Sequence, residues 1–171
     1  LYISSGTWSL MGTERKEADC SLESMKRNFT NEGGYEYRFR YLKNIMGLWM
    51  IQSVKKELAA KGQDYSFAQL CEEASKENIE SLVDCNDGRF LAPESMIQEV
   101  KAYCGEHGQE VPETPAQLAA VIYNSLAFCY GETIKELEQI TGQIYSQIHI
   151  VGGGANADYL NRLTAKYTDR T

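Results

Sequence analysis

The apolar positions of this chain follow a period of two in some segments and a helical period in others. Residues 1–5 and 8–13 form short apolar or alternating runs bounded by glycines, which predicts two strands joined as a hairpin. Residues 14–34 are polar and rich in turn-forming side chains, which predicts a loop. Aromatic and charged side chains then alternate over residues 35–40, which predicts a third strand.

Helical spacing dominates the middle of the chain. Apolar residues between Leu42 and Trp49 are three and four positions apart and predict a helix that runs to about residue 60. Ser66 stands in N-cap position for a helix over residues 66–76, and Pro93 suits the first position of a helix over residues 93–104. The longest predicted helix begins at Thr114 and Pro115, ends at Gly142, and places apolar side chains at Leu118, Ile122, Leu126, Tyr130, Ile134 and Leu137.

A glycine-rich turn follows the last predicted strand, residues 148–151. Gly152, Gly153 and Gly154 come next, and Asn156 stands in N-cap position for a helix to about residue 167. Glycines carry no Cβ and permit positive φ, so the main chain of such a turn can touch a flat base or a phosphate. The turn lacks the G-x-G-x-x-G spacing of dinucleotide-binding sites, and no lysine follows the glycines as in a Walker loop. The turn therefore suits a nucleoside better than a pyrophosphate. A tight turn formed for packing alone explains the triplet equally well.

The order of these elements indicates the fold class. Strands followed by helices, with a glycine turn at the carboxyl end of a strand, predict a mixed α/β fold that binds ligands at that edge. The 171 residues are enough for one domain or part of one. The predicted strands are few for a complete sheet, and the chain starts at Leu1 within a strand and stops at Thr171 just after a helix. We therefore expect a fragment of a longer protein.

Composition narrows the range of partners. The chain has 24 acidic and 17 basic side chains and a net charge of −7, so no basic surface is available to bind nucleic acid. No segment approaches the roughly 20 apolar residues of a membrane helix, and we expect no secretory signal because the first residues lack the pattern of one. The five cysteines are scattered and form no C-x-x-C pair, so we expect reduced thiols, a cytoplasmic location and no metal site.

Several polar positions are candidates for ligand contact. Asn44 and Gln52 are neutral amides in the helix predicted from residue 42, where they would lie roughly 12 Å apart along the axis and about 80° apart around it. One helix side could then serve two parts of an extended ligand, although solvent-facing amides explain the pattern equally well. Thr7 follows two serines and a glycine at a strand end, which suits a phosphate site or an ordinary hairpin. The histidines and cysteines form no catalytic constellation.

Five blocks of the sequence, in this order, resemble the FGGY family of carbohydrate kinases. They are SSGTWSLMG from residue 4, TNEGG from residue 30, LKNIMGLW from residue 42, DGRFLAPESM from residue 87 and IHIVGGG from residue 148. The blocks span nearly the whole chain. The combination of the first three blocks is far more specific for this family than the glycine triplet, which many actin-like ATPases share.

The resemblance implies a two-domain enzyme with the actin-like, RNase H-like ATPase fold. Residues 1–171 would be most of its C-terminal domain, with the N-terminal sugar-binding domain and the last strands lying outside the chain. The family pattern also implies roles for single residues in this sequence. Thr7, Gln52 and Gly153 would contact the nucleotide, Gly154 and Asn156 would shape the adenosine pocket, and Asn44 would contact the sugar.

The implied reaction transfers the γ-phosphoryl group of ATP, with Mg²⁺, to the 1-hydroxyl of L-rhamnulose. The family's base is an Asp in a Gly-His-Asp-Thr motif that these residues lack, so the resemblance places no catalytic residue and no metal ligand in this chain. We expect the chain alone to be inactive. The alternatives are a kinase for another ketose, such as L-fuculose or D-xylulose, and a non-catalytic module that senses nucleotide or sugar. The oligomeric state is left open.

Overall fold

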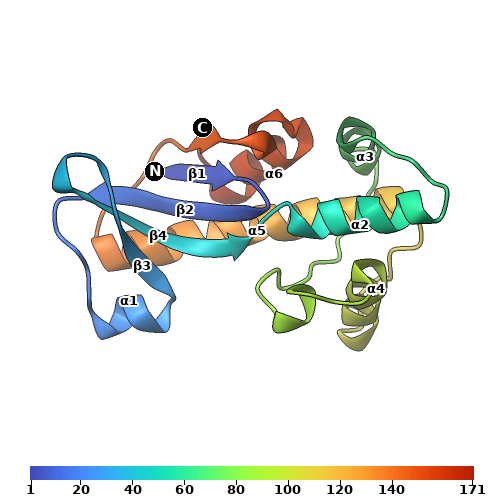
Figure 1. The fold of residues 1–171 in the computed structure, drawn as a ribbon, viewed down its shortest axis with the longest axis horizontal. Helices are drawn as coiled ribbons and strands as arrows, with labels where there is room; N and C mark the ends of the chain where they lie inside the picture. Colours follow the sequence, from blue (N-terminus) through green and yellow to red (C-terminus); the bar gives the residue numbers. More distant parts are fainter.

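The computed structural model describes residues 1–171 and contains a five-stranded mixed sheet with helices beside it (Figure 1). The strand order is β3-β4-β2-β1-β5. Pairs β1–β2, β2–β4 and β3–β4 are antiparallel, and β5 lies parallel to β1 at the sheet edge. The strands are β1 (Tyr2–Ser5), β2 (Trp8–Arg15), β3 (Phe29–Gly33), β4 (Phe39–Met46) and β5 (His149–Val151). The predicted mixed α/β class is confirmed.

Six α-helices complete the fold. In Figure 1 the long α5 runs behind the sheet and continues past its end, where α2, α3 and α4 gather around it. Helix α6 packs against α5. None of the helices combines the length and apolar character that a membrane crossing requires. The helices are α1 (Leu22–Lys26), α2 (Trp49–Ala60), α3 (Phe67–Ala74), α4 (Met96–Glu106), α5 (Pro115–Thr141) and α6 (Asp158–Thr168), with 3₁₀ turns η1 (Tyr35–Tyr37), η2 (Gly88–Phe90) and η3 (Gly153–Asn156).

The sheet buries the face that lies toward α5. Met11 of β2 and Ile45 of β4 are fully buried in the main apolar cluster, which also draws side chains from α2 to α6. Ser9 and Tyr130 of α5 share a buried hydrogen bond of 2.6 Å between their hydroxyl oxygens. Leu10 and Asn44 alternate with these residues and so lie on the other face, where Leu10 is half-buried and Asn44 exposed. Contact with α5 thus fixes the register of the two central strands.

The boundaries of α5 and α3 follow from local sequence. Thr114 and Gln117 form a capping box at the start of α5, and Gly142 ends the helix with a φ of 68°. Ser66 and Gln69 form the same box at the start of α3. The predictions of these two helices are confirmed, as is the prediction of a last strand before the glycine turn.

The helix predicted from residue 42 is wrong in its first part. Residues Phe39–Met46 form β4, which pairs with β2 on one side and with β3 on the other, and α2 begins only at Trp49. Tyr41 and Leu42 point to opposite faces, yet both are fully buried. Where neighbouring residues of a strand are buried on both faces, the alternation is lost, so the apolar residues imitate helical spacing. Asn44 therefore belongs to β4 and does not share a helix with Gln52.

Four other predicted segments also differ from the structure. The strand predicted over residues 35–40 is wrong in its first part, because Tyr35–Tyr37 form η1 and β4 begins only at Phe39. Residues 14–34 are not a loop throughout, because they contain the end of β2, α1 and β3; β3 is an edge strand with little apolar pattern. Helix α4 starts at Met96 rather than at Pro93, since Ser95 caps it and Glu57 of α2 accepts a hydrogen bond from the Ser95 hydroxyl. Asn156 is not the N-cap of α6, because the chain first completes η3 and the helix begins after Ala157.

Tyr130 makes the fold sensitive to alkaline pH. Burial raises the pKa of the Tyr130 phenol from 10.0 to about 12, although the nearby serine hydroxyls lower it. Above pH 10 the unfolded chain therefore releases a proton that the folded chain retains. Unfolding becomes more favourable as pH rises through this window, by up to about 1.4 kcal/mol per pH unit for this residue.

We expect the urea midpoint of the chain, followed by circular dichroism, to fall between pH 10 and pH 11. Tyr130→Phe removes one titrating group, so the stability difference between the wild type and this variant should narrow over the same interval. A difference that stayed constant from pH 8 to pH 11 would contradict the assignment of this titration to Tyr130.

Candidate functional site

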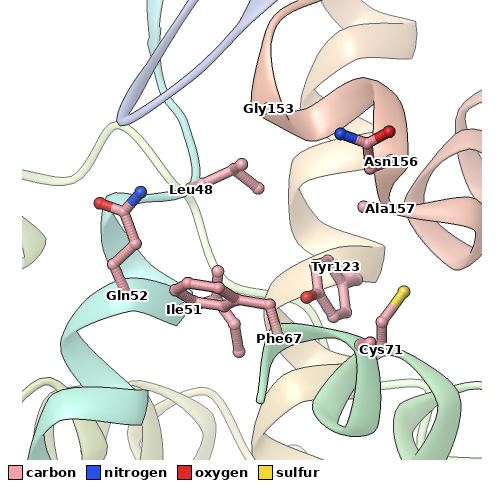
Figure 2. A pocket seen from close by; sticks show the side chains of 10 residues that line it. Leu48, Ile51, Gln52, Phe67, Cys71, Tyr123, Gly153, Asn156 and Ala157 are labelled. Carbon is pink, nitrogen blue, oxygen red and sulfur yellow. The ribbon is translucent and has the colours of Figure 1, made fainter.

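A cavity of about 280 Å³ lies between α2, α3, α5 and the glycine turn (Figure 2). Most of its wall is apolar, and two neutral amides, Gln52 and Asn156, supply its most polar side chains. The cavity has no charged residue in its wall. Its lining residues are Leu48, Ile51, Gln52, Phe67, Ala68, Cys71, Tyr123, Gly153, Asn156 and Ala157.

The turn between β1 and β2 holds the start of α2 in place beside this cavity. The backbone N–H of Leu48 donates to the carbonyl of Gly6 (2.9 Å), and that of Trp49 donates to the carbonyl of Thr7 (3.0 Å). No side chain caps α2, so these carbonyls satisfy two of its free N–H groups. The Thr7 hydroxyl also donates to the side-chain oxygen of Gln52 at 3.3 Å. This contact leaves the Gln52 amide nitrogen free to meet a ligand.

The three glycines of the turn have different structural roles. Gly152 takes a φ of +89°, and a Cβ there would lie 2.6 Å from the carbonyl oxygen of Ser5. Gly154 is buried, and a Cβ there would lie 1.9 Å from the Ser5 hydroxyl oxygen. Gly153 lines the cavity, and no atom lies within 4 Å of the place where its Cβ would be. Gly152 and Gly154 thus allow the turn to pack on β1, while Gly153 leaves space toward the cavity.

The structure brings together some of the residues singled out from sequence and separates others. Gln52, Gly153 and Asn156 line the same cavity although they come from distant parts of the chain. Thr7 is exposed and lies one hydrogen bond away, next to Gln52. Gly154 is the buried glycine of the turn, packed against Ser5, and does not line the cavity.

Asn44 lies outside the cavity. It is exposed on the face of the sheet opposite α5, in register with Leu10 of β2. Two residues further along, Met46 pairs with Trp8, the first residue of β2 after Thr7. Asn44 is therefore near the end of the sheet that carries the cavity, but on a separate surface.

Sequence reasoning missed the walls contributed by α3 and α5. Phe67 is the first residue of α3 and remains 46% exposed at the cavity, whereas Tyr123 of α5 is only 2% exposed. Burial raises the pKa of the Tyr123 phenol, which keeps this side chain neutral. An aromatic residue directly after an N-cap was the only sequence signal for Phe67, and Tyr123 looked like any other apolar position of a core helix.

Known proteins with similar sequences are carbohydrate kinases. The model of the C-terminal domain of the FGGY family of carbohydrate kinases matches residues 1–171. The rhamnulokinase of Oceanobacillus iheyensis is 46% identical over 171 residues, which are 100% of this chain and 36% of that protein. The rhamnulokinase of Bacillus subtilis is 50% identical over 165 residues, which are 96% of this chain and 33% of that protein. The chain thus spans about a third of the length of these relatives.

Two solved structures have a similar fold. The xylulose kinase of Bifidobacterium adolescentis superposes with a TM-score of 0.63 at 16% identity, over 99% of this chain and 32% of that one. A second sugar kinase, from Brucella ovis and described as a xyloylose kinase, gives a TM-score of 0.64 at 15% identity, over 99% of this chain and 34% of that one. At such identities these two matches bear on the fold alone.

Proposed function

We propose that this chain, which belongs to the FGGY family of carbohydrate kinases, is the nucleotide-binding part of an ATP-dependent kinase for L-rhamnulose. In this proposal the cavity beside the glycine turn holds the adenosine of ATP, and the γ-phosphoryl group passes to the 1-hydroxyl of the sugar. The base that accepts the hydroxyl proton, the N-terminal sugar-binding domain and the last strands of the sheet would belong to the rest of the polypeptide. We call that complete polypeptide the full-length kinase.

One observation carries the nucleotide assignment. Gln52 is more than a hundred positions before Gly153 and Asn156 in the sequence, yet the three residues line a single, mostly apolar cavity. An apolar wall with a few neutral hydrogen-bonding groups suits the flat, uncharged base of a nucleotide. The free space at Gly153 supports close approach of the ligand to the main chain. Thr7 supports the same site by holding the Gln52 side chain.

The cavity does not fit Mg²⁺ as a resident metal. It has no carboxylate in its wall, and no group of three or more metal-binding side chains occurs among residues 1–171. Magnesium prefers carboxylate, phosphate and water oxygens. We therefore propose that the Mg²⁺ used with ATP is held by the phosphates and by groups outside this chain, and that no residue here is a metal ligand.

The choice of sugar follows the relatives that are named rhamnulokinases. Asn44 offers an exposed neutral amide at the end of β4, and such a group can donate to and accept from sugar hydroxyls. L-Fuculose and D-xylulose are the alternative substrates to test. The five cysteines are all free thiols, which supports a cytoplasmic location.

Paired substitutions in the full-length kinase test the two assignments. Gly153→Val places methyl groups where we propose that the nucleoside lies, so the KM for ATP should rise roughly tenfold or more while the KM for L-rhamnulose changes little. Asn44→Ala removes a hydrogen-bonding group from the sugar side, so the KM for L-rhamnulose should rise roughly threefold to tenfold while the KM for ATP stays close to normal. A coupled assay of ADP release measures both.

Gly88→Val is the matched control, because Gly88 also has no atom within 4 Å of its Cβ position but does not line the cavity. If Gly153→Val and Asn44→Ala each changed the KM for ATP and the KM for L-rhamnulose equally, the assignment of Gly153 to the nucleotide and Asn44 to the sugar would be refuted. Stronger activity of the unmodified enzyme on L-fuculose or D-xylulose would refute the sugar assignment. Nucleotide binding without any sugar phosphorylation would favour a sensing module.

A further inference from the structure

Phe67 is a large apolar side chain that the fold holds partly in solvent at the cavity. It is the first residue of α3, and 46% of it remains exposed. The capping box of Ser66 and Gln69 fixes the start of the helix, with the Gln69 N–H donating to Ser66 at 3.1 Å and the Ser66 N–H donating to Gln69 at 2.8 Å. The aromatic ring is therefore presented from a rigid position rather than from a loop.

Two neighbours hold the ring at the cavity. Figure 2 shows Phe67 reaching from α3 toward Ile51 of α2, with Gly153 and Asn156 on the other side of the open space. The ammonium nitrogen of Lys55 lies 5.6 Å from the ring centroid, within range of a cation–π interaction. Lys55 is in turn 3.7 Å from a carboxylate oxygen of Asp64. The ring thus has neighbours at the cavity while 46% of the residue stays exposed.

We propose that Phe67 stacks on the purine base of the nucleotide and gives this site its preference for purine over pyrimidine triphosphates. This inference rests on the proposed function, since it assumes that the cavity holds the base. A planar base can cover the exposed ring, and a two-ring purine covers more of it than a one-ring pyrimidine. Tyr123 is the other aromatic residue in the wall and is only 2% exposed, so Phe67 is the aromatic surface that the base can use.

The test uses the full-length kinase with Phe67→Ala, Phe67→Tyr and the control Phe128→Ala. Phe128 is a comparable phenylalanine, 41% exposed on α5, which does not line this cavity. Loss of a base–aromatic stack corresponds to a roughly 5- to 150-fold weaker interaction. Phe67→Ala should therefore raise the KM for ATP within that range and reduce the preference for ATP over UTP, with kcat and the KM for L-rhamnulose nearly unchanged. Phe67→Tyr should behave like the wild type.

Equilibrium binding of ADP and UDP, measured by calorimetry, provides a second readout that does not depend on turnover. An unchanged KM for ATP in Phe67→Ala would overturn the inference. Equal losses of affinity for ADP and UDP, or an effect no larger than that of Phe128→Ala, would also overturn it, because a purely structural role predicts those results. If Gly153→Val leaves the KM for ATP unchanged, the proposed nucleotide site itself fails. If Gly153→Val weakens ATP binding while Phe67→Ala does not, only the proposed role of Phe67 fails.

Discussion

Replacing Gly12 with alanine should destabilise the sheet so strongly that little folded protein is recovered. Gly12 lies in β2, opposite Leu42 of β4, and a Cβ at this position would lie 2.2 Å from the carbonyl oxygen of Tyr41 and 2.6 Å from the Cβ of Leu42. Backbone cannot rotate away as a flexible side chain can, so β4 would have to separate from β2. Overpacking a core typically costs about 1–3 kcal/mol, and we expect Gly12→Ala to reach or exceed the upper value.

Gly33→Ala is the matched control for this prediction. Gly33 also lies in a strand of the same sheet, in register with Phe39, but no atom lies within 4 Å of its Cβ position. Alanine there should be neutral or slightly stabilising, because it restricts the unfolded chain without a clash. Soluble yield and the urea midpoint of both variants measure the effect. Similar midpoints for the two variants would show that the approach of β2 and β4 at Gly12 does not limit stability.

The comparison of β4 with α5 shows which elements could be predicted from the sequence. Helix α5 carries its own boundary signals, with a capping box and a proline at its start and a glycine in the left-handed conformation at its end. Strand β4 carries none, and its apolar residues reflect neighbours on both faces that are distant in sequence. The local pattern therefore locates α5 correctly but assigns β4 from Leu42 onward to a helix.

In the site, too, features set by neighbouring residues could be predicted, and features set by residues distant in sequence could not. The glycine turn could be predicted because its backbone requirements are local: Gly152 adopts a positive φ. The distinct roles of its glycines could not, since the atoms that make Gly154 necessary belong to Ser5 of β1. Phe67 and Tyr123 complete the wall only because α3 and α5 pack beside the turn. Such packing is a tertiary property that no sequence window contains.

Gly154→Ala should abolish most nucleotide binding by the full-length kinase, and a second substitution at Ser5 should restore much of it. A Cβ on Gly154 would lie 1.9 Å from the hydroxyl oxygen and 2.6 Å from the Cβ of Ser5, which is itself 1% exposed and cannot move aside into solvent. The turn would have to lift off β1, which would displace Gly153 at the cavity. We expect the KM for ATP to rise more than tenfold, with a lower melting temperature.

Ser5→Gly removes both of the atoms that cause this clash. The next atom to the Gly154 Cβ position would be the Ser5 carbonyl oxygen at 3.4 Å, an ordinary contact distance. The single change Ser5→Gly should cost about 0.5–1 kcal/mol through backbone entropy. The double variant should therefore bind ATP better than Gly154→Ala alone, with a favourable coupling in the double-mutant cycle. Additive losses from the two substitutions would mean that Gly154 is needed for some reason other than the close packing of the turn on β1.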